Sequence, residues 1–124
     1  YKENVIDYLS TKNTKELSFE NNDKLEIICV PPWEIEKLKI EIDHFHNAAS
    51  FVEMPKKIIE NYVKYLKKNN TDQISLVSYD SYDLKTTFKP EILNDFFNNK
   101  LEMNWHPAVI KDHNRKSLYL TSKV

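Results

Sequence analysis

The sequence predicts an α+β fold: a single small domain over residues 1–124, with a mixed or antiparallel sheet of about five or six strands covered by two to three helices. Two observations lead to this prediction. Hydrophobic residues make up 40% of the 124 residues, enough for one core without stabilising cross-links. In some segments apolar and polar residues alternate, as they do in strands, whereas in others the apolar residues recur at helical spacing. The chain begins with Tyr1 rather than Met, which is compatible with a fragment of a longer protein.

The N-terminal part predicts a short helix and then a β-hairpin. Apolar residues in residues 3–10 (ENVIDYLS) recur at helical spacing. Residues 16–20 and 24–30 are expected to be the arms of the hairpin, because Asn21-Asn22-Asp23 between them is typical of a turn. Pro31-Pro32 then ends the second arm.

Residues 33–54 fit two different structures. As a helix, this segment presents one apolar stripe. As a strand, residues 37–43 alternate apolar and charged side chains without exception. We favour the strand, extended into the histidines that follow it, because Ser50 and Glu53 have the spacing of a capping box. That motif predicts a new helix after a turn at residues 46–49.

The most regular helical pattern follows this segment and runs to about Asn69. Lysines occupy most of the polar positions of this helix, and Pro55 sits near its first turns. Its buried stripe is expected to comprise Ile58, Ile59, Tyr62, Val63 and Leu66.

The C-terminal part predicts strands around a second, shorter helix. Residues 73–80 and 82–88 are expected to be strands joined by a tight turn at Asp80-Ser81. Pro90 is expected to open the short helix, which ends near residue 97. We expect residues 104–116 to be irregular and residues 117–122 to form the last strand.

The chain contains no glycine, although roughly 7% of residues in an average protein are glycine. Phosphate-binding loops, dinucleotide fingerprints and nucleophile elbows need backbone conformations that only glycine allows, so these nucleotide-binding and hydrolase classes are excluded. Asparagine tolerates positive φ better than most residues. We therefore expect chain reversals at Asn21-Asn22-Asp23, Asn69-Asn70, Asn98-Asn99 and His113-Asn114.

Charge and cysteine content limit the possible partners and compartment. Eighteen basic and nineteen acidic residues leave a net charge of −1, so no global field attracts nucleic acid or anionic membranes. No apolar run has membrane-spanning length. The single Cys29 excludes an internal disulfide, which favours a soluble protein of a reducing, intracellular compartment, cytoplasmic or nuclear.

Two histidines form the first candidate site. On a strand, His44 and His46 project from one face, where they can bind one divalent metal, Mg²⁺ or Mn²⁺. His-Phe-His resembles the His-hydrophobic-His motif of HUH endonucleases. The resemblance implies a metal-dependent DNA-nicking enzyme, in which the tyrosine of a Tyr-x-x-Lys motif attacks the scissile phosphate. Tyr65 and Lys68 match that motif, with Tyr62 one turn earlier. The alternative is that both histidines only make local hydrogen bonds at a strand end.

The lysine-rich helix is the second candidate site. Its five lysines can bind the phosphate backbone of a nucleic acid, although a solvated helix face has the same composition. These residues are Lys56, Lys57, Lys64, Lys67 and Lys68.

Elimination of the glycine-dependent classes favours a non-enzymatic protein–protein interaction domain, an adaptor or inhibitor-like module without a cofactor and without membrane insertion. Trp33 and Trp105 each adjoin a proline-containing turn and are either core residues or anchors of an interface. We expect docking of a partner protein through Trp33, Trp105 and His106. A long exposed loop between Asn98 and Asn114 is expected to contribute.

Overall fold

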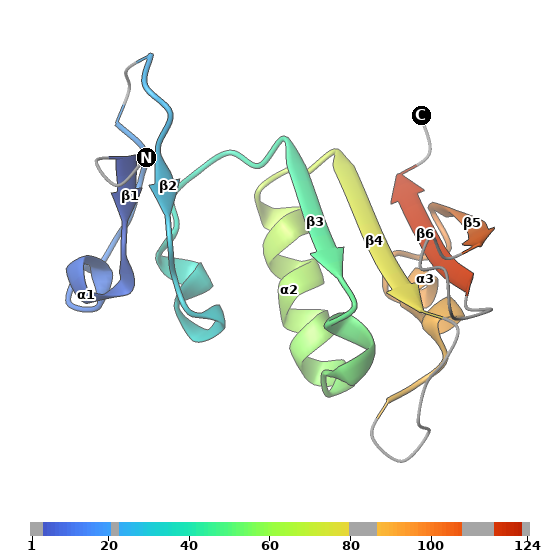
Figure 1. The fold of residues 1–124 in the computed structure, drawn as a ribbon. Helices are drawn as coiled ribbons and strands as arrows, with labels where there is room; N and C mark the ends of the chain where they lie inside the picture. The colour runs from blue at the N-terminus through green and yellow to red at the C-terminus, as the bar shows by residue number, and fades with distance from the viewer. Residues whose placement is uncertain (1–3, 21–22, 80–86, 108–115, 123–124) are drawn as a thin grey trace. The chain divides into compact units, whose positions relative to one another are not determined.

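The computed structural model describes residues 4–20, 23–79, 87–107 and 116–122, which form helices and strands in an α+β arrangement (Figure 1). The α+β prediction is confirmed. The described residues contain six strands, as expected, but these form two sheets, of four and two strands, rather than one. The chain divides into two compact units, Tyr1–Glu41 and Ile42–Val124. That residues 1–124 form one domain stays a prediction.

The first unit contains a parallel pair of short strands, β1 (Val5–Ile6) and β2 (Ile27–Ile28). The backbone N–H of Cys29 donates a hydrogen bond to the Ile6 carbonyl at 2.8 Å, which extends this pairing. The predicted hairpin is wrong, because among the described residues the strand in its second arm, β2, pairs with β1 and not with the first arm. Leu17 of the first arm forms a parallel bridge with Leu38 instead. Such distant parallel partners have no local sequence signal.

A short helix, α1 (Tyr8–Thr11), follows β1, so the predicted helix over residues 3–10 is wrong in its first half. Asp7 caps α1 by accepting hydrogen bonds from the Ser10 N–H at 2.9 Å and the Ser10 hydroxyl at 3.0 Å. These bonds stabilise the ionised carboxylate and lower the pKa of Asp7. The cap fixes the helix start at Tyr8 and leaves the β-branched pair before it free to form β1.

The second unit is built on a mixed sheet with the strand order β3-β4-β6-β5. β3 (His44–Ala48) and β4 (Gln73–Tyr79) are parallel and are connected through the helix α2 (Lys56–Lys68). β6 (Lys116–Ser122) is antiparallel both to β4 and to β5 (Leu101–Pro107). The strand predicted at residues 117–122 is confirmed, as is the described part of the strand predicted at residues 73–80.

The strand predicted at residues 37–43 is wrong, because β3 begins only at His44. Lys37 is the last residue of η2 (Pro32–Lys37), a 3-10 helix that Pro32 opens. The alternation of apolar and charged residues favours an extended backbone, but a strand also needs a hydrogen-bonding neighbour. β4 supplies that neighbour only for residues 44–48.

The turn predicted at residues 46–49 is wrong for residues 46–48, which belong to β3. The predicted capping box does not form. Residues 51–53 make a single 3-10 turn, η3 (Phe51–Glu53), and the Ser50 side chain makes no capping hydrogen bond to it. Asn47 takes over this role, because its Oδ1 accepts from the Phe51 N–H at 3.2 Å. The long helix therefore starts later than expected, after Pro55.

The main core lies between α2 and the sheet of the second unit. The buried stripe predicted for α2 holds for Ile59, Val63 and Leu66 but is wrong for Ile58, which is 41% exposed. Successive residues of a helix point about 100° apart, so a residue next to a fully buried one can point to solvent, as Ile58 does beside Ile59. The buried cluster comprises Phe51, Val52, Ile59, Val63, Leu66, Leu76, Leu93, Phe97, Leu101, Leu118 and Leu120.

Pro90 opens a short helical segment as predicted, first as η4 (Pro90–Ile92) and then as α3 (Leu93–Phe96). The chain reverses after it at Asn98 and Asn99, with φ of 56° and 57°, and reverses after α2 at Asn70, with φ of 49°. These asparagine turns are confirmed. β5 follows, so the predicted irregular segment is wrong for residues 104–107 and the predicted long loop is wrong for residues 101–107.

Several predictions lie outside the described residues. They are the turns at Asn21-Asn22, Asp80-Ser81 and Asn114, and most of the strand expected at residues 82–88. Thr87 and Phe88, the described end of that segment, are not part of a strand.

Candidate functional site

His44 and His46 project from one face of β3, as the metal-site hypothesis requires. The parallel register places Ser75 of β4 directly beside His46. The Ser75 Oγ lies 2.8 Å from His44 Nε2 and 2.7 Å from His46 Nδ1. Both rings are exposed. The two imidazoles therefore converge on a single hydroxyl, and sequence reasoning missed Ser75 because strand register is not visible in the sequence.

The tyrosines of the proposed nicking motif lie on the other face of the sheet. Phe45, between the two histidines, packs against Phe51 and Tyr62 with ring centroids 5.7 and 6.4 Å apart. Neighbouring residues of a strand point to opposite faces, so the histidines point away from α2. α2 carries Tyr62, Tyr65 and Lys68. The structure does not bring these residues together with the histidines.

The environment of the two tyrosines also disfavours attack by a phenolate. Burial against the core raises the pKa of Tyr62 and of Tyr65, because the charged phenolate loses solvation there. A nucleophile is normally activated by the opposite change, a lowered pKa or an adjacent base. Within the described residues, no three His, Cys, Asp or Glu side chains gather closely enough to hold a metal ion.

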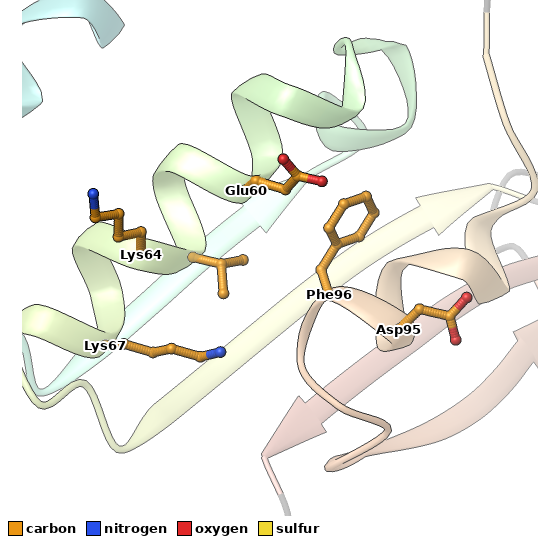
Figure 2. Close-up of a pocket in the computed structure, with 6 residues that line it drawn as sticks. Glu60, Lys64, Lys67, Asp95 and Phe96 are labelled. Atoms are coloured by element: carbon orange, nitrogen blue, oxygen red, sulfur yellow. The ribbon is translucent and has the colours of Figure 1, made fainter.

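The five lysines of α2 are all exposed and occupy the solvent side of the helix. Two of them, Lys64 and Lys67, line a groove of about 450 Å³ between α2 and α3. Glu60 and Asp95 line the same groove, so its four charges cancel. Figure 2 shows Lys67 reaching towards Phe96, while Lys64 points away. Two of the five lysines therefore lie beside acidic groups, which weakens the positive field that they offer to a polyanion.

Large apolar side chains are exposed in the first unit. Trp33 on η2 is 78% exposed, Leu9 on α1 is 71% exposed and Leu25 before β2 is 61% exposed. Leu17 is the single buried hydrophobic residue among the described residues of this unit. Sequence reasoning identified Trp33 but missed the two leucines, because an apolar residue in a periodic pattern is normally assigned to the core.

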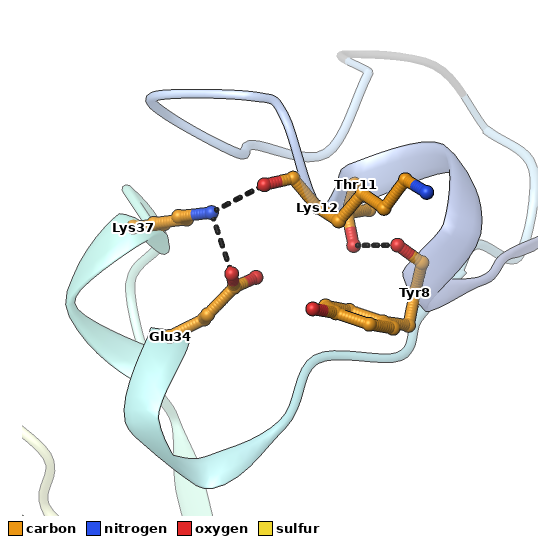
Figure 3. Close-up of polar contacts among 5 residues, drawn as sticks. All are labelled: Tyr8, Thr11, Lys12, Glu34 and Lys37. Atoms are coloured by element: carbon orange, nitrogen blue, oxygen red, sulfur yellow. Dashed lines mark hydrogen bonds and ion pairs between the residues drawn. The ribbon is translucent and has the colours of Figure 1, made fainter.

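A polar contact holds the turn that carries Trp33. Lys37 Nζ pairs with Glu34 Oε1 at 2.8 Å and donates to the backbone carbonyl of Lys12 at 3.2 Å. Figure 3 shows Lys37 joining η2 to the end of α1 in this way. The Glu34 side chain is only 11% exposed, so water screens this pair less than an ordinary surface ion pair. Trp33 and Leu9 therefore project from two elements that are joined to each other.

Trp105 and His106 lie on β5 and point to opposite faces of the sheet. Trp105 pairs in register with the buried Leu118, and it is 41% exposed beside Met103, which is 48% exposed. His106 lies on the other face, where its ring meets Tyr119 edge-on at a centroid distance of 5.0 Å. Because they lie on opposite faces of the sheet, Trp105 and His106 cannot belong to one continuous binding patch.

Comparison of the chain with protein-family models, with curated proteins and with solved structures found no match. None of the described helices has both the length and the apolar character that are needed to cross a membrane.

Proposed function

We propose that this chain is a protein-interaction module that docks a partner protein through Trp33 and Leu9, the anchor surface of the first unit. The supporting observation is the exposure of these two side chains, 78% and 71%, in a unit whose described residues bury one hydrophobic side chain. Exposing large apolar groups costs free energy, and covering them is the main driving force of protein association. Trp is also the residue most enriched among energetic hot spots of interfaces.

The small size of the unit supports the same proposal. Units of about 40 residues normally need disulfides, metals or association to be stable. The only cysteine of the chain, Cys29, is a free thiol, and the described residues contain no metal cluster. A partner that covers the anchor surface supplies the apolar burial that this unit lacks.

The anchor is held in a defined orientation, which favours tight binding. The Glu34–Lys37–Lys12 contact fixes η2 against α1 before the partner arrives. A side chain presented on a fixed turn loses less conformational freedom on binding than one on a loose loop. Neither of these contacts involves the Trp33 indole, so the indole stays accessible to a partner.

Trp33→Ala tests this proposal. A partner is captured by crosslinking with the wild-type chain, identified, purified and titrated against both forms. We expect the substitution to weaken the purified pair by about 30-fold, because truncation of an aromatic hot spot costs about 2 kcal/mol. The melting temperature should not change, because the indole is exposed.

Ile58→Ala is the matched control. Ile58 is also a large exposed apolar residue, at 41%, but it lies on α2 of the second unit. We expect this variant to bind the partner like the wild type. Equal binding by Trp33→Ala and the wild type, or equal weakening by both variants, would contradict the proposal.

A further inference from the structure

The two histidines of β3 are held towards each other by a hydroxyl of the neighbouring strand. Ser75 Oγ lies 2.8 Å from His44 Nε2 and 2.7 Å from His46 Nδ1. A hydroxyl has one proton, so it donates to one imidazole and accepts from the other. The ring nitrogen that accepts the Ser75 proton therefore already directs its lone pair towards Ser75 Oγ. The nitrogen of the other ring donates its own N–H to that oxygen, and it directs a lone pair there only after that ring changes tautomer.

We propose that His44 and His46 together bind one late first-row transition metal ion, Zn²⁺, Ni²⁺ or Cu²⁺, next to the Ser75 hydroxyl. A histidine nitrogen binds such ions at about 2.0–2.1 Å, shorter than the present contacts to the oxygen. Both rings are exposed, and rotation about their side-chain bonds can bring the nitrogens to that distance. The site uses residues outside the anchor surface and does not depend on the proposed docking function.

The donor atoms select the class of metal. Imidazole suits Zn²⁺, Cu²⁺ and Ni²⁺, whereas Mg²⁺ and Mn²⁺ prefer carboxylate, carbonyl and water oxygens. This pair therefore does not fit the Mg²⁺ or Mn²⁺ that its resemblance to a nicking enzyme implied. His44 and His46 are held on one face of the strand before the ion arrives. Less conformational entropy is therefore lost when both side chains bind the same ion.

The surroundings leave coordination positions open. Within the described part of the chain, no third His, Cys, Asp or Glu completes a cluster with this pair. A hollow of about 530 Å³ adjoins the site and is lined by His44, Ser75, Asp72 and Thr121, among others. Water or another small ligand can occupy the remaining positions of the ion there. Asp72 can accept a hydrogen bond from such a ligand.

Metal titration of the untagged 124-residue chain tests the site. The exposed thiol of Cys29 also binds soft metals, so all forms carry Cys29→Ser. We expect calorimetry with Zn²⁺ and with Ni²⁺ to give one equivalent per chain. His44→Ala and His46→Ala should each weaken binding by at least about tenfold, because each removes one of two protein ligands. Electron paramagnetic resonance of the Cu²⁺ complex should report two nitrogen ligands.

His106→Ala is the matched control, because His106 is another exposed imidazole of the same sheet face. It should bind metal like the parent, and Mg²⁺ should give no heat at the same concentrations. Circular dichroism checks that every variant is folded. The proposal is overturned if none of the three metals binds, if the His44→Ala, His46→Ala double variant binds like the parent, or if His106→Ala loses as much affinity as the single variants.

Discussion

Asn94 is the buried polar side chain that connects α3 to β5. It is 4% exposed, its Nδ2 donates to the Leu101 carbonyl, and its Oδ1 accepts from the Leu101 N–H, both at 2.9 Å. Both backbone groups of Leu101 therefore depend on one amide. A buried donor or acceptor left without a partner costs about 1–3 kcal/mol.

Asn94→Ala should therefore lower the free energy of unfolding by about 2–3 kcal/mol, measured by urea denaturation. Asn61→Ala is the control, because Asn61 is exposed on α2 and its replacement should change stability by less than about 0.5 kcal/mol. Similar small effects of both substitutions would show that the Asn94 bonds are not needed to hold β5.

Ala49 occupies a conformation that glycine normally takes. Its φ is 63°, in the left-handed region, where a Cβ atom costs about 1 kcal/mol or more. Its backbone N–H nevertheless donates to the Val77 carbonyl at 2.7 Å, which fixes the end of β3 against β4. The absence of glycine from the chain thus leaves strain at this turn.

Two adjacent alanines give predictions of opposite sign. Ala49→Gly should raise the free energy of unfolding by about 1 kcal/mol, because it relieves the strain at positive φ. Ala48→Gly should lower it by about 0.5–1 kcal/mol, because Ala48 lies within β3, where glycine only adds freedom to the unfolded chain. Urea denaturation of both variants measures the difference. Destabilisation by both would contradict the strain at Ala49.

At the scale of elements, the long helix is the clearest test of packing. Ile58 and Ile59 are neighbours in sequence, but Ile58 is 41% exposed and Ile59 is 0% exposed. Ile59→Ala should lower the free energy of unfolding by about 2–5 kcal/mol through lost burial and a cavity. Ile58→Ala should cost less than about 1 kcal/mol. Equal losses in thermal or urea unfolding would show that α2 is rotated from the orientation described.

Helical periodicity and turn chemistry predicted some elements, because they act locally. The apolar spacing after Pro55 and the proline at residue 90 both indicated helices that the structure contains. Strand partners were not predictable in the same way. The alternation at residues 37–43 is as regular as that of any strand, yet only Leu38 finds a bridge partner, Leu17. Pairing depends on which distant segment comes near, and the sequence has no local signal for that.

The candidate site was predictable in part for the same reason. The spacing of His44 and His46 predicted a shared face only if the two residues lie on a strand, and β3 places both of them on one. Ser75 lies about thirty residues away and meets them through parallel register alone. Tyr65 lies on α2, which packs on the opposite face of the sheet, where Phe45 contacts Tyr62 of the same helix. This packing has no local signal in the sequence.

At the scale of the whole molecule, the two units differ in how much apolar surface they bury. The cluster of eleven buried residues lies entirely in Ile42–Val124. Among its described residues the first unit buries only one hydrophobic side chain, Leu17, and its strand pairing consists of a two-residue ladder and one bridge. Regions with few buried apolar contacts open locally at low free-energy cost. The two units should therefore differ in local stability.

Hydrogen exchange of the full chain should show this difference. We expect the Cys29 amide, which bonds to Ile6 in the first unit, to exchange at least about tenfold faster than the amides of Leu76 and Leu120 in the second. Binding of the partner should slow the exchange of Cys29. Equal protection of the three amides in the free chain would mean that the first unit is as stable as the second.

The exposure of Trp33, free and bound, is the most direct test of the central claim that the first unit docks a partner protein. A Trp105→Phe form of the full chain leaves Trp33 as its only tryptophan, and acrylamide quenching measures its accessibility. The indole should be readily quenched in the free chain and strongly protected once the purified partner is bound. Protection already present in the free chain, or quenching that the partner leaves unchanged, would contradict the account.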